Sequence, residues 1–186
     1  MIKKQPWEQF IHFWSQFYDE QGDADEKFYN PYINDLSKED FLDKLWRWKM
    51  GVHFHNRNNQ KALRLMEEQK ERIREYRNTK PTFDELWNFS REIFAGGLIY
   101  SIFLIHICKP KDYPIFDQHA FRSFIFLTKG EIIKEPQNIA DYKDYKRFIL
   151  KIHKEFDVNL RDIDKAFMAF GQFLNDPVKF MKKGRV

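Results

Sequence analysis

The residues with the clearest chemical potential are Asp117, His119 and Arg122, which follow the extended apolar tetrad at residues 113–116. Pro114 disfavours helical geometry in the residue before it, so any preceding helix must already have ended. Asp117 is a strong N-cap residue, and apolar residues then recur at helical spacing. The pattern predicts a rigidly held carboxylate at the positive end of a helix. Such a group can be a structural cap beside a salt-bridging Arg122, or a preorganised catalytic acid group.

A second feature lies upstream, where an apolar segment over residues 93–101 is interrupted by the pair Gly96-Gly97. The apolar pattern then continues as a predicted helix over residues 98–108. Residues 84–128 therefore predict the order helix, glycine-containing turn, helix, proline-containing loop, aspartate and helix. A turn of this kind can aim backbone amides at a phosphate.

This order and spacing resembles the helix-hairpin-helix DNA glycosylase superfamily, which contains endonuclease III and the adenine mismatch glycosylases. In that family a leucine-proline-glycine-x-glycine hairpin precedes a helix. A short loop then leads to a valine-aspartate-threonine-histidine-like motif with an arginine soon after. Asp117-Gln118-His119-Ala120-Phe121-Arg122 is similar to the second element, and Gly97 falls at the hairpin's second glycine. The resemblance covers about residues 84–128.

The resemblance implies a fold, an activity and a set of site residues. The fold is a compact all-α domain with two lobes around a cleft, and the activity is base excision in DNA repair. Asp117 would be the catalytic carboxylate, which stabilises an oxocarbenium-like cation or activates a water molecule. DNA is the expected partner, and the nucleic-acid-binding residues implied by the matched positions are Gly96, Gly97, Ile99, His119 and Arg122.

The sequence departs from the family pattern at two places. Ile99 occupies the position of the Schiff-base lysine of bifunctional members, so the resemblance implies a monofunctional hydrolase without a lyase step. The hairpin reads Phe94-Ala95-Gly96-Gly97 instead of a proline with spaced glycines, which weakens the expected phosphate contact.

Two other classes of function stay open. One is a helical scaffold that binds nucleic acid or protein and has lost glycosylase chemistry, and the altered hairpin favours it. The other is a protein-interaction domain unrelated to glycosylases. The Asp117, His119 and Arg122 pattern favours the enzyme.

Composition is compatible with these expectations. The 186 residues are enough for a single domain over 1–186, or for two lobes that share a core. Seven Gly and few Val or Thr argue against an all-β fold. The net charge of +4 is mildly basic, which suits a nucleic-acid partner without requiring one.

Cysteine content and hydropathy predict the setting. The single cysteine, Cys108, excludes an intramolecular disulfide and a Cys-ligated iron–sulfur cluster, and we expect no cofactor and no metal. The N-terminus lacks the apolar core of a signal peptide, and the longest uncharged run, residues 93–108, is too short to span a membrane. We therefore expect a cytoplasmic protein without a membrane partner.

Other patterns have a structural and a functional interpretation. His53 and His55 have a spacing that suits metal ligation, but a polar connector is the simpler interpretation. The basic segments 60–80 and 143–154 are either solvated helix faces or phosphate contacts. Trp46-Arg47-Trp48 can supply a stacking surface or pack in the core.

The elements that must position these residues are helices, and we predict eight or nine of them. Thr82 to Glu85 forms a capping-box pattern, Ser37 and Asn159 are candidate N-caps, and Gly51 is a helix stop. Loops are expected at residues 19–31, 52–59 and 131–138, followed by a polar tail. The expected helices cover residues 6–18, 37–50, 60–77, 82–94, 98–108, 117–128, 141–155 and 160–174.

Overall fold

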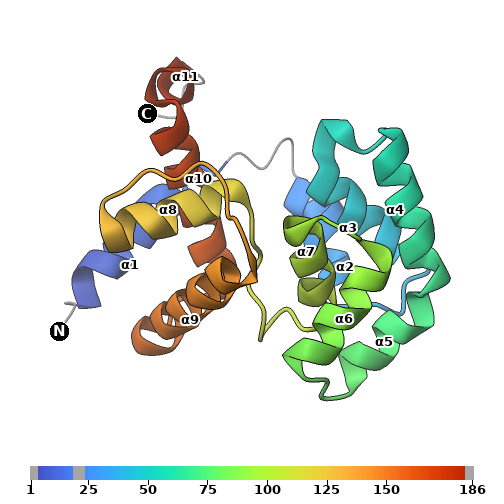
Figure 1. Cartoon of the computed structure of the whole chain (residues 1–186). Coiled ribbons are helices and arrows are strands. Elements are labelled where there is room, and N and C mark those ends of the chain that lie inside the picture. The colour runs from blue at the N-terminus through green and yellow to red at the C-terminus, as the bar shows by residue number, and fades with distance from the viewer. Residues whose placement is uncertain (1–3, 19–23, 183–186) are drawn as a thin grey trace. The chain divides into compact units, whose positions relative to one another are not determined.

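The structure is a computed structural model that describes residues 4–18 and 24–182, and its regular elements are all helical (Figure 1). No β-strand occurs among these residues, so the predicted all-α class is confirmed. Internal packing divides the chain into unit 1, Met1–Asp19 with Lys111–Val186, and unit 2, Glu20–Pro110. The predicted helix-hairpin-helix segment at 84–128 contributes to both units. The glycosylase-like arrangement of two lobes around a cleft stays a prediction.

Unit 1 is built around helix α10, which packs against both α1 and α8. Its interior is aromatic, and Phe116, Phe121, Tyr145 and Phe167 are all almost completely buried. These rings explain the high aromatic content of the chain, because they fill the space between the helices of a small unit. The helices of unit 1 are α1 (Lys4–Ser15), α8 (Gln118–Lys129), α9 (Ile139–Phe156), α10 (Leu160–Asn175) and α11 (Pro177–Lys182).

Unit 2 surrounds helix α7, in which every residue from Ser101 to Cys108 is buried. This burial accounts for the lack of a polar face in that stretch of sequence. The other elements are a π-helix (Asp25–Tyr29), α2 (Asn30–Ile33), α3 (Phe41–Met50), a 3-10 turn (Gly51–His53), α4 (Arg57–Glu68), α5 (Lys70–Asn78) and α6 (Phe83–Ile93), with α7 at Leu98–Cys108.

The strongest local signals of the sequence are confirmed. Thr82 and Glu85 form a reciprocal capping box at the start of α6. Asp117 and Asn159 cap α8 and α10 through their side chains. Gly51 ends α3 with φ of 52°, a backbone conformation that residues other than glycine rarely adopt. Residues 84–128 have the predicted order of helix, turn, helix, loop and helix.

Several predicted boundaries are wrong. Ser37 caps no helix, because its hydroxyl donates to Asp35 and α3 begins only after Asp40. The long helix predicted at 60–77 is two helices that meet at Gln69. The predicted loop at 19–31 is helical from residue 24, whereas residues 19–23 lie outside the described part. Helix α11 lies within the predicted polar tail. The described residues therefore hold more helices than the eight or nine predicted.

Among the described residues, no helix combines the length and the apolar character needed to cross a membrane.

Candidate functional site

Asp117 holds the start of α8 through one of its two carboxylate oxygens. Its Oδ1 accepts hydrogen bonds from the backbone N–H groups of His119, at 2.7 Å, and Ala120, at 2.8 Å. Within the part of the chain that the structure describes, no group donates to Oδ2. Asp117 is half-buried. The carboxylate is thus fixed in position by one oxygen, and the other oxygen is open to a ligand or water.

The segment that leads into Asp117 is anchored by buried aromatic rings. Phe116 is fully buried, and its ring centroid lies 5.0 Å from that of Tyr145 and 5.2 Å from that of Tyr142. The Tyr142 hydroxyl also donates a long hydrogen bond, of 3.4 Å, to the carbonyl of Pro114. Because the residues before Asp117 are packed in this way, the carboxylate cannot shift without disturbing the core of unit 1.

Arg122 is buried and holds backbone rather than facing solvent. It is 2% exposed, and its guanidinium donates to the carbonyls of Gly171, at 2.9 Å, and Lys134, at 3.1 Å. No carboxylate lies within 4.0 Å of the Arg122 guanidinium among the described residues. The salt bridge that was expected for Arg122 if Asp117 is only a structural cap is therefore not observed. Burial lowers the pKa of Arg122, and the charges of Asp117 and Glu135 act in the opposite direction. This geometry gives Arg122 a positioning role.

His119 is oriented by Arg122. The distance between the Arg122 Nη1 and the His119 Nδ1 atoms is 2.8 Å. Because a guanidinium only donates, Nδ1 must accept, and a neutral His119 ring therefore carries its proton on Nε2. The ring is half-buried. His119 thus lies on the first turn of α8, two residues from the Asp117 carboxylate, with its tautomer set by its neighbour.

A very close contact between helices α8 and α10 supports this arrangement. A Cβ atom added at Gly171 would lie 1.9 Å from the backbone carbonyl oxygen of His119. The Ser123 hydroxyl adds a 2.6 Å hydrogen bond to the carbonyl of Phe167. Only glycine allows the two backbones to approach so closely. Gly171 and Ser123 could not be identified from the sequence, because no nearby residue indicates a contact with another helix.

Tyr145 is a second feature that the sequence did not indicate. Its side chain is fully buried, and its hydroxyl has no hydrogen-bond partner among the described residues. Burial, followed by the negative charges of Asp164 and Asp117, raises the pKa of Tyr145 well above 10. Tyr145 therefore stays neutral over the physiological pH range.

The turn between α6 and α7 lies in unit 2 and is exposed at Ala95 and Gly96. Arg91 closes the turn by donating to the carbonyl of Ala95. Gly97 is the N-cap residue of α7 and has no side chain with which to cap it. The amides of the first turn of α7, at residues 98–100, have no acceptor within the helix. Gly96 and Gly97 both have negative φ, so a left-handed conformation is not the reason for this glycine pair.

Ile99 is half-buried in the first turn of α7. Its side chain offers neither a nucleophile nor a hydrogen bond, so only its backbone amide can contact a phosphate. The predicted site residues thus fall into two groups. Gly96, Gly97 and Ile99 lie together at the turn of unit 2, and Asp117, His119 and Arg122 lie together at the start of α8 in unit 1.

The remaining sequence patterns are largely structural. Trp46 is buried, and its indole N–H donates to the carbonyl of Asn59 at 2.9 Å. The Trp48 indole N–H donates to Asp25 at 2.8 Å. Both tryptophans are therefore bonded within unit 2. His53 and His55 are exposed, and no group of three or more potential metal ligands occurs among the described residues.

No family model, curated protein or solved structure matches the chain.

Proposed function

We propose that the protein binds DNA and acts as a monofunctional DNA glycosylase, a hydrolase of the N-glycosidic bond, with Asp117 as the catalytic carboxylate. One observation carries the proposal. Asp117 is half-buried and fixed by two backbone amides through Oδ1, while no described group donates to Oδ2. The cap uses only Oδ1, so it leaves Oδ2 without a structural task among the described residues. Oδ2 is the atom that can meet a substrate.

The chemistry follows from this placement. Base excision breaks the C1′–N bond of a nucleotide that has left the base stack, and positive charge develops on the sugar. A preorganised carboxylate stabilises that charge, or it takes a proton from the attacking water. The two amides that donate to Oδ1 hold the Asp117 carboxylate in one orientation, so little reorganisation is needed during the reaction.

The nucleophile in this proposal is water. Ile99 has no amine, so it cannot form a Schiff base. Arg91, which lies at the turn, donates to the carbonyl of Ala95. The reaction therefore ends with a free base and an abasic site, without strand cleavage.

DNA contact is assigned to the turn of unit 2. The first-turn amides of α7 are available to a phosphate because Gly97 provides no capping side chain. Gly96 is exposed, and its Cβ position is open, so the backbone of a ligand can approach the turn. Contacts of this type grip the phosphate backbone and do not read the base sequence.

A non-catalytic scaffold that binds nucleic acid or protein is the second candidate. The observation that favours it is the same cap, because the two hydrogen bonds to Oδ1 are by themselves a sufficient reason for an aspartate at position 117. The glycosylase and the scaffold predict different results for a variant that keeps the helix cap but removes the negative charge of Asp117. Base excision should be lost only if the protein is a glycosylase.

The test is a glycosylase screen over duplexes that each carry one modified or mismatched base. The proposal expects release of a free base from at least one duplex, and alkali should be needed to cleave the strand afterwards. Borohydride should trap no covalent protein–DNA adduct. A trapped adduct would overturn the monofunctional assignment, and failure to excise any base across the panel would favour the scaffold.

A further inference from the structure

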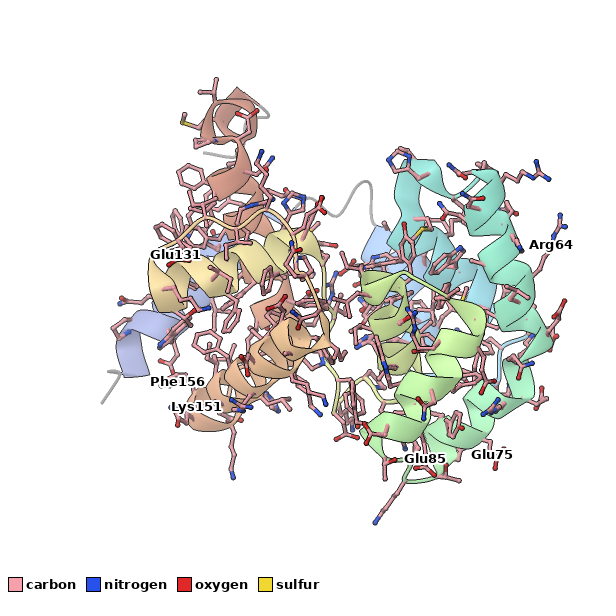
Figure 2. The ribbon with its side chains drawn as sticks, viewed as in Figure 1. Arg64, Glu75, Glu85, Glu131, Lys151 and Phe156 are labelled. Carbon is pink, nitrogen blue, oxygen red and sulfur yellow. The ribbon has the colours of Figure 1, made fainter. Side chains whose placement is uncertain are left out.

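Three cationic side chains on helix α4 have no interaction partner within the described part of the protein. Arg57, Lys61 and Arg64 recur at i, i+4 and i+7, so they lie on one face of the helix. All three side chains are exposed, and Figure 2 shows Arg64 extending away from the helix. Among the described residues, none of these three side chains has a hydrogen bond, an ion pair or a ring contact. We call these residues the α4 basic row.

The cations of the next helix behave differently. Lys70 pairs with Glu39 at 2.7 Å, and Arg72 pairs with Glu92 at 2.7 Å. Arg74 pairs with Glu71 at 2.5 Å and also donates to the carbonyl of Leu36. These three cations thus have partners within unit 2. The basic segment of the sequence thus contains one group of cations with structural partners and one group without them.

The stability of α4 does not account for the row. Arg57 is the first residue of the helix, where positive charge opposes the helix dipole, and the first turn contains no acidic residue. Arg57 and Lys61 are like charges at i and i+4, which destabilises an isolated helix by about 0.2–0.5 kcal/mol. Glu68 follows Arg64 by one turn but lies more than 4.0 Å from it, since no ion pair joins them. The arrangement therefore costs folding free energy and suits an anionic partner.

Trp46 connects the start of α4 to the turn between α6 and α7. Its indole N–H bonds the carbonyl of Asn59 in the first turn of α4. Its ring lies 5.6 Å from that of Phe94 and 5.5 Å from that of Tyr100, which flank the turn. Trp46 thus contacts the N-terminal ends of both α4 and α7. Neither helix has an acidic residue in its first turn. The basic row starts from the same part of unit 2 as the turn.

We propose that the α4 basic row binds the phosphate backbone of duplex DNA alongside the α6–α7 turn. This inference rests on the proposed function and extends the DNA-binding surface of unit 2. Arg57 to Arg64 spans about 10 Å of helix axis. A DNA strand carries one phosphate per about 3.4 Å of duplex axis, so the row has the reach to meet about three phosphates. Contact of this kind is insensitive to base sequence.

The experiment compares binding to one unmodified duplex of about 20 base pairs, by fluorescence anisotropy over a series of salt concentrations. The test variant carries Arg57→Gln, Lys61→Gln and Arg64→Gln, because glutamine keeps helix propensity and removes charge. The control carries Arg147→Gln, Lys151→Gln and Lys154→Gln on α9, where the first two cations already pair with Asp144 and Glu155. Both variants lose the same formal charge.

The inference expects the slope of log K against log salt to fall in magnitude by about 2 to 3 in the test variant, and by much less in the control. An unchanged slope in the test variant, with normal wild-type binding, would overturn the α4 assignment and leave the proposed function intact. Equal losses in both variants would show that net charge alone matters and would also overturn it. If the wild type does not bind the duplex even at low salt, both the inference and the proposed function fail.

Discussion

At the scale of single residues, the two oxygens of Asp117 differ in their contacts. Oδ1 accepts from two amides of α8, whereas no described group donates to Oδ2. The cap could be predicted from the sequence, because a cap depends on a few neighbouring residues. The role of Arg122 could not, since its acceptors Gly171 and Lys134 are distant in the chain. The implied nucleic-acid contact of Arg122 stays untested, and its burial makes it the least suitable of the matched residues for such a contact.

Gly171→Ala should destabilise unit 1 by about 3 kcal/mol, because the added methyl group would overlap the carbonyl of His119. In an open helix the same substitution would stabilise by about 1 kcal/mol, so the expected sign is opposite to that of helix propensity. Urea unfolding measures the difference. Gly96→Ala is the matched control, because its Cβ would contact nothing within 4 Å. A Gly171→Ala variant as stable as the wild type would contradict the close approach of α8 and α10.

Tyr145→Phe should leave stability unchanged or raise it by about 1 kcal/mol, since it removes a buried hydroxyl that has no partner among the described residues. Tyr142→Phe is the comparison, because its hydroxyl donates to the carbonyl of Pro114 and its loss should lower stability. Both are measured by thermal unfolding. A clear loss of stability in Tyr145→Phe would show that the hydroxyl does have a partner, such as a buried water.

At the scale of elements, local signals predicted helix starts well and long-range packing poorly. The caps at Thr82, Asp117 and Asn159 are specified by neighbouring residues. The break between α4 and α5 at Gln69 is not specified by its neighbours, because residues 60–77 are all compatible with a continuous helix. The cations that follow the break bond to distant groups, as Lys70 does to Glu39 and Arg74 does to the carbonyl of Leu36. Such contacts have no signature in a local pattern.

Thr82→Ala should cost about 1 kcal/mol of stability, because it removes the hydroxyl that accepts the N–H of Glu85 in the capping box. Thr82→Ser keeps that hydroxyl and should restore most of the loss. The two variants can be compared by urea unfolding. If serine and alanine are equally destabilising at this position, the cap does not stabilise α6 in the way described.

At the scale of the whole molecule, both units bury groups that must stay protonated. Burial raises the pKa of Cys108, in unit 2, from 9.0 to about 12. Burial also raises the pKa values of Tyr142 and Tyr145, in unit 1, well above 10. The unfolded chain releases these protons at lower pH than the folded chain does. Stability is therefore fully present below about pH 9 and is lost as pH rises above it, with a limiting slope of about 1.4 kcal/mol per pH unit and proton.

The melting temperature should accordingly fall between about pH 9 and pH 11. Tyr145→Phe should reduce the fall, because one of the three protons no longer contributes. The measurement is a series of thermal melts at constant ionic strength. A melting temperature that stays flat to pH 11 would contradict the burial of these groups.

We propose above that the negatively charged carboxylate of Asp117 is catalytic. The most direct test is to measure Asp117→Asn in a single-turnover excision assay, on a duplex that the wild type processes. Asparagine caps helices as well as aspartate does, so the melting temperature should change little. Asp141→Asn is the matched control, since Asp141 is also a carboxylate that accepts backbone N–H groups at the start of a helix in unit 1. We predict that Asp117→Asn lowers the excision rate at least about 100-fold, while Asp141→Asn leaves it nearly unchanged. An Asp117→Asn variant that excises at the wild-type rate, or that loses activity only because it unfolds, would contradict the claim.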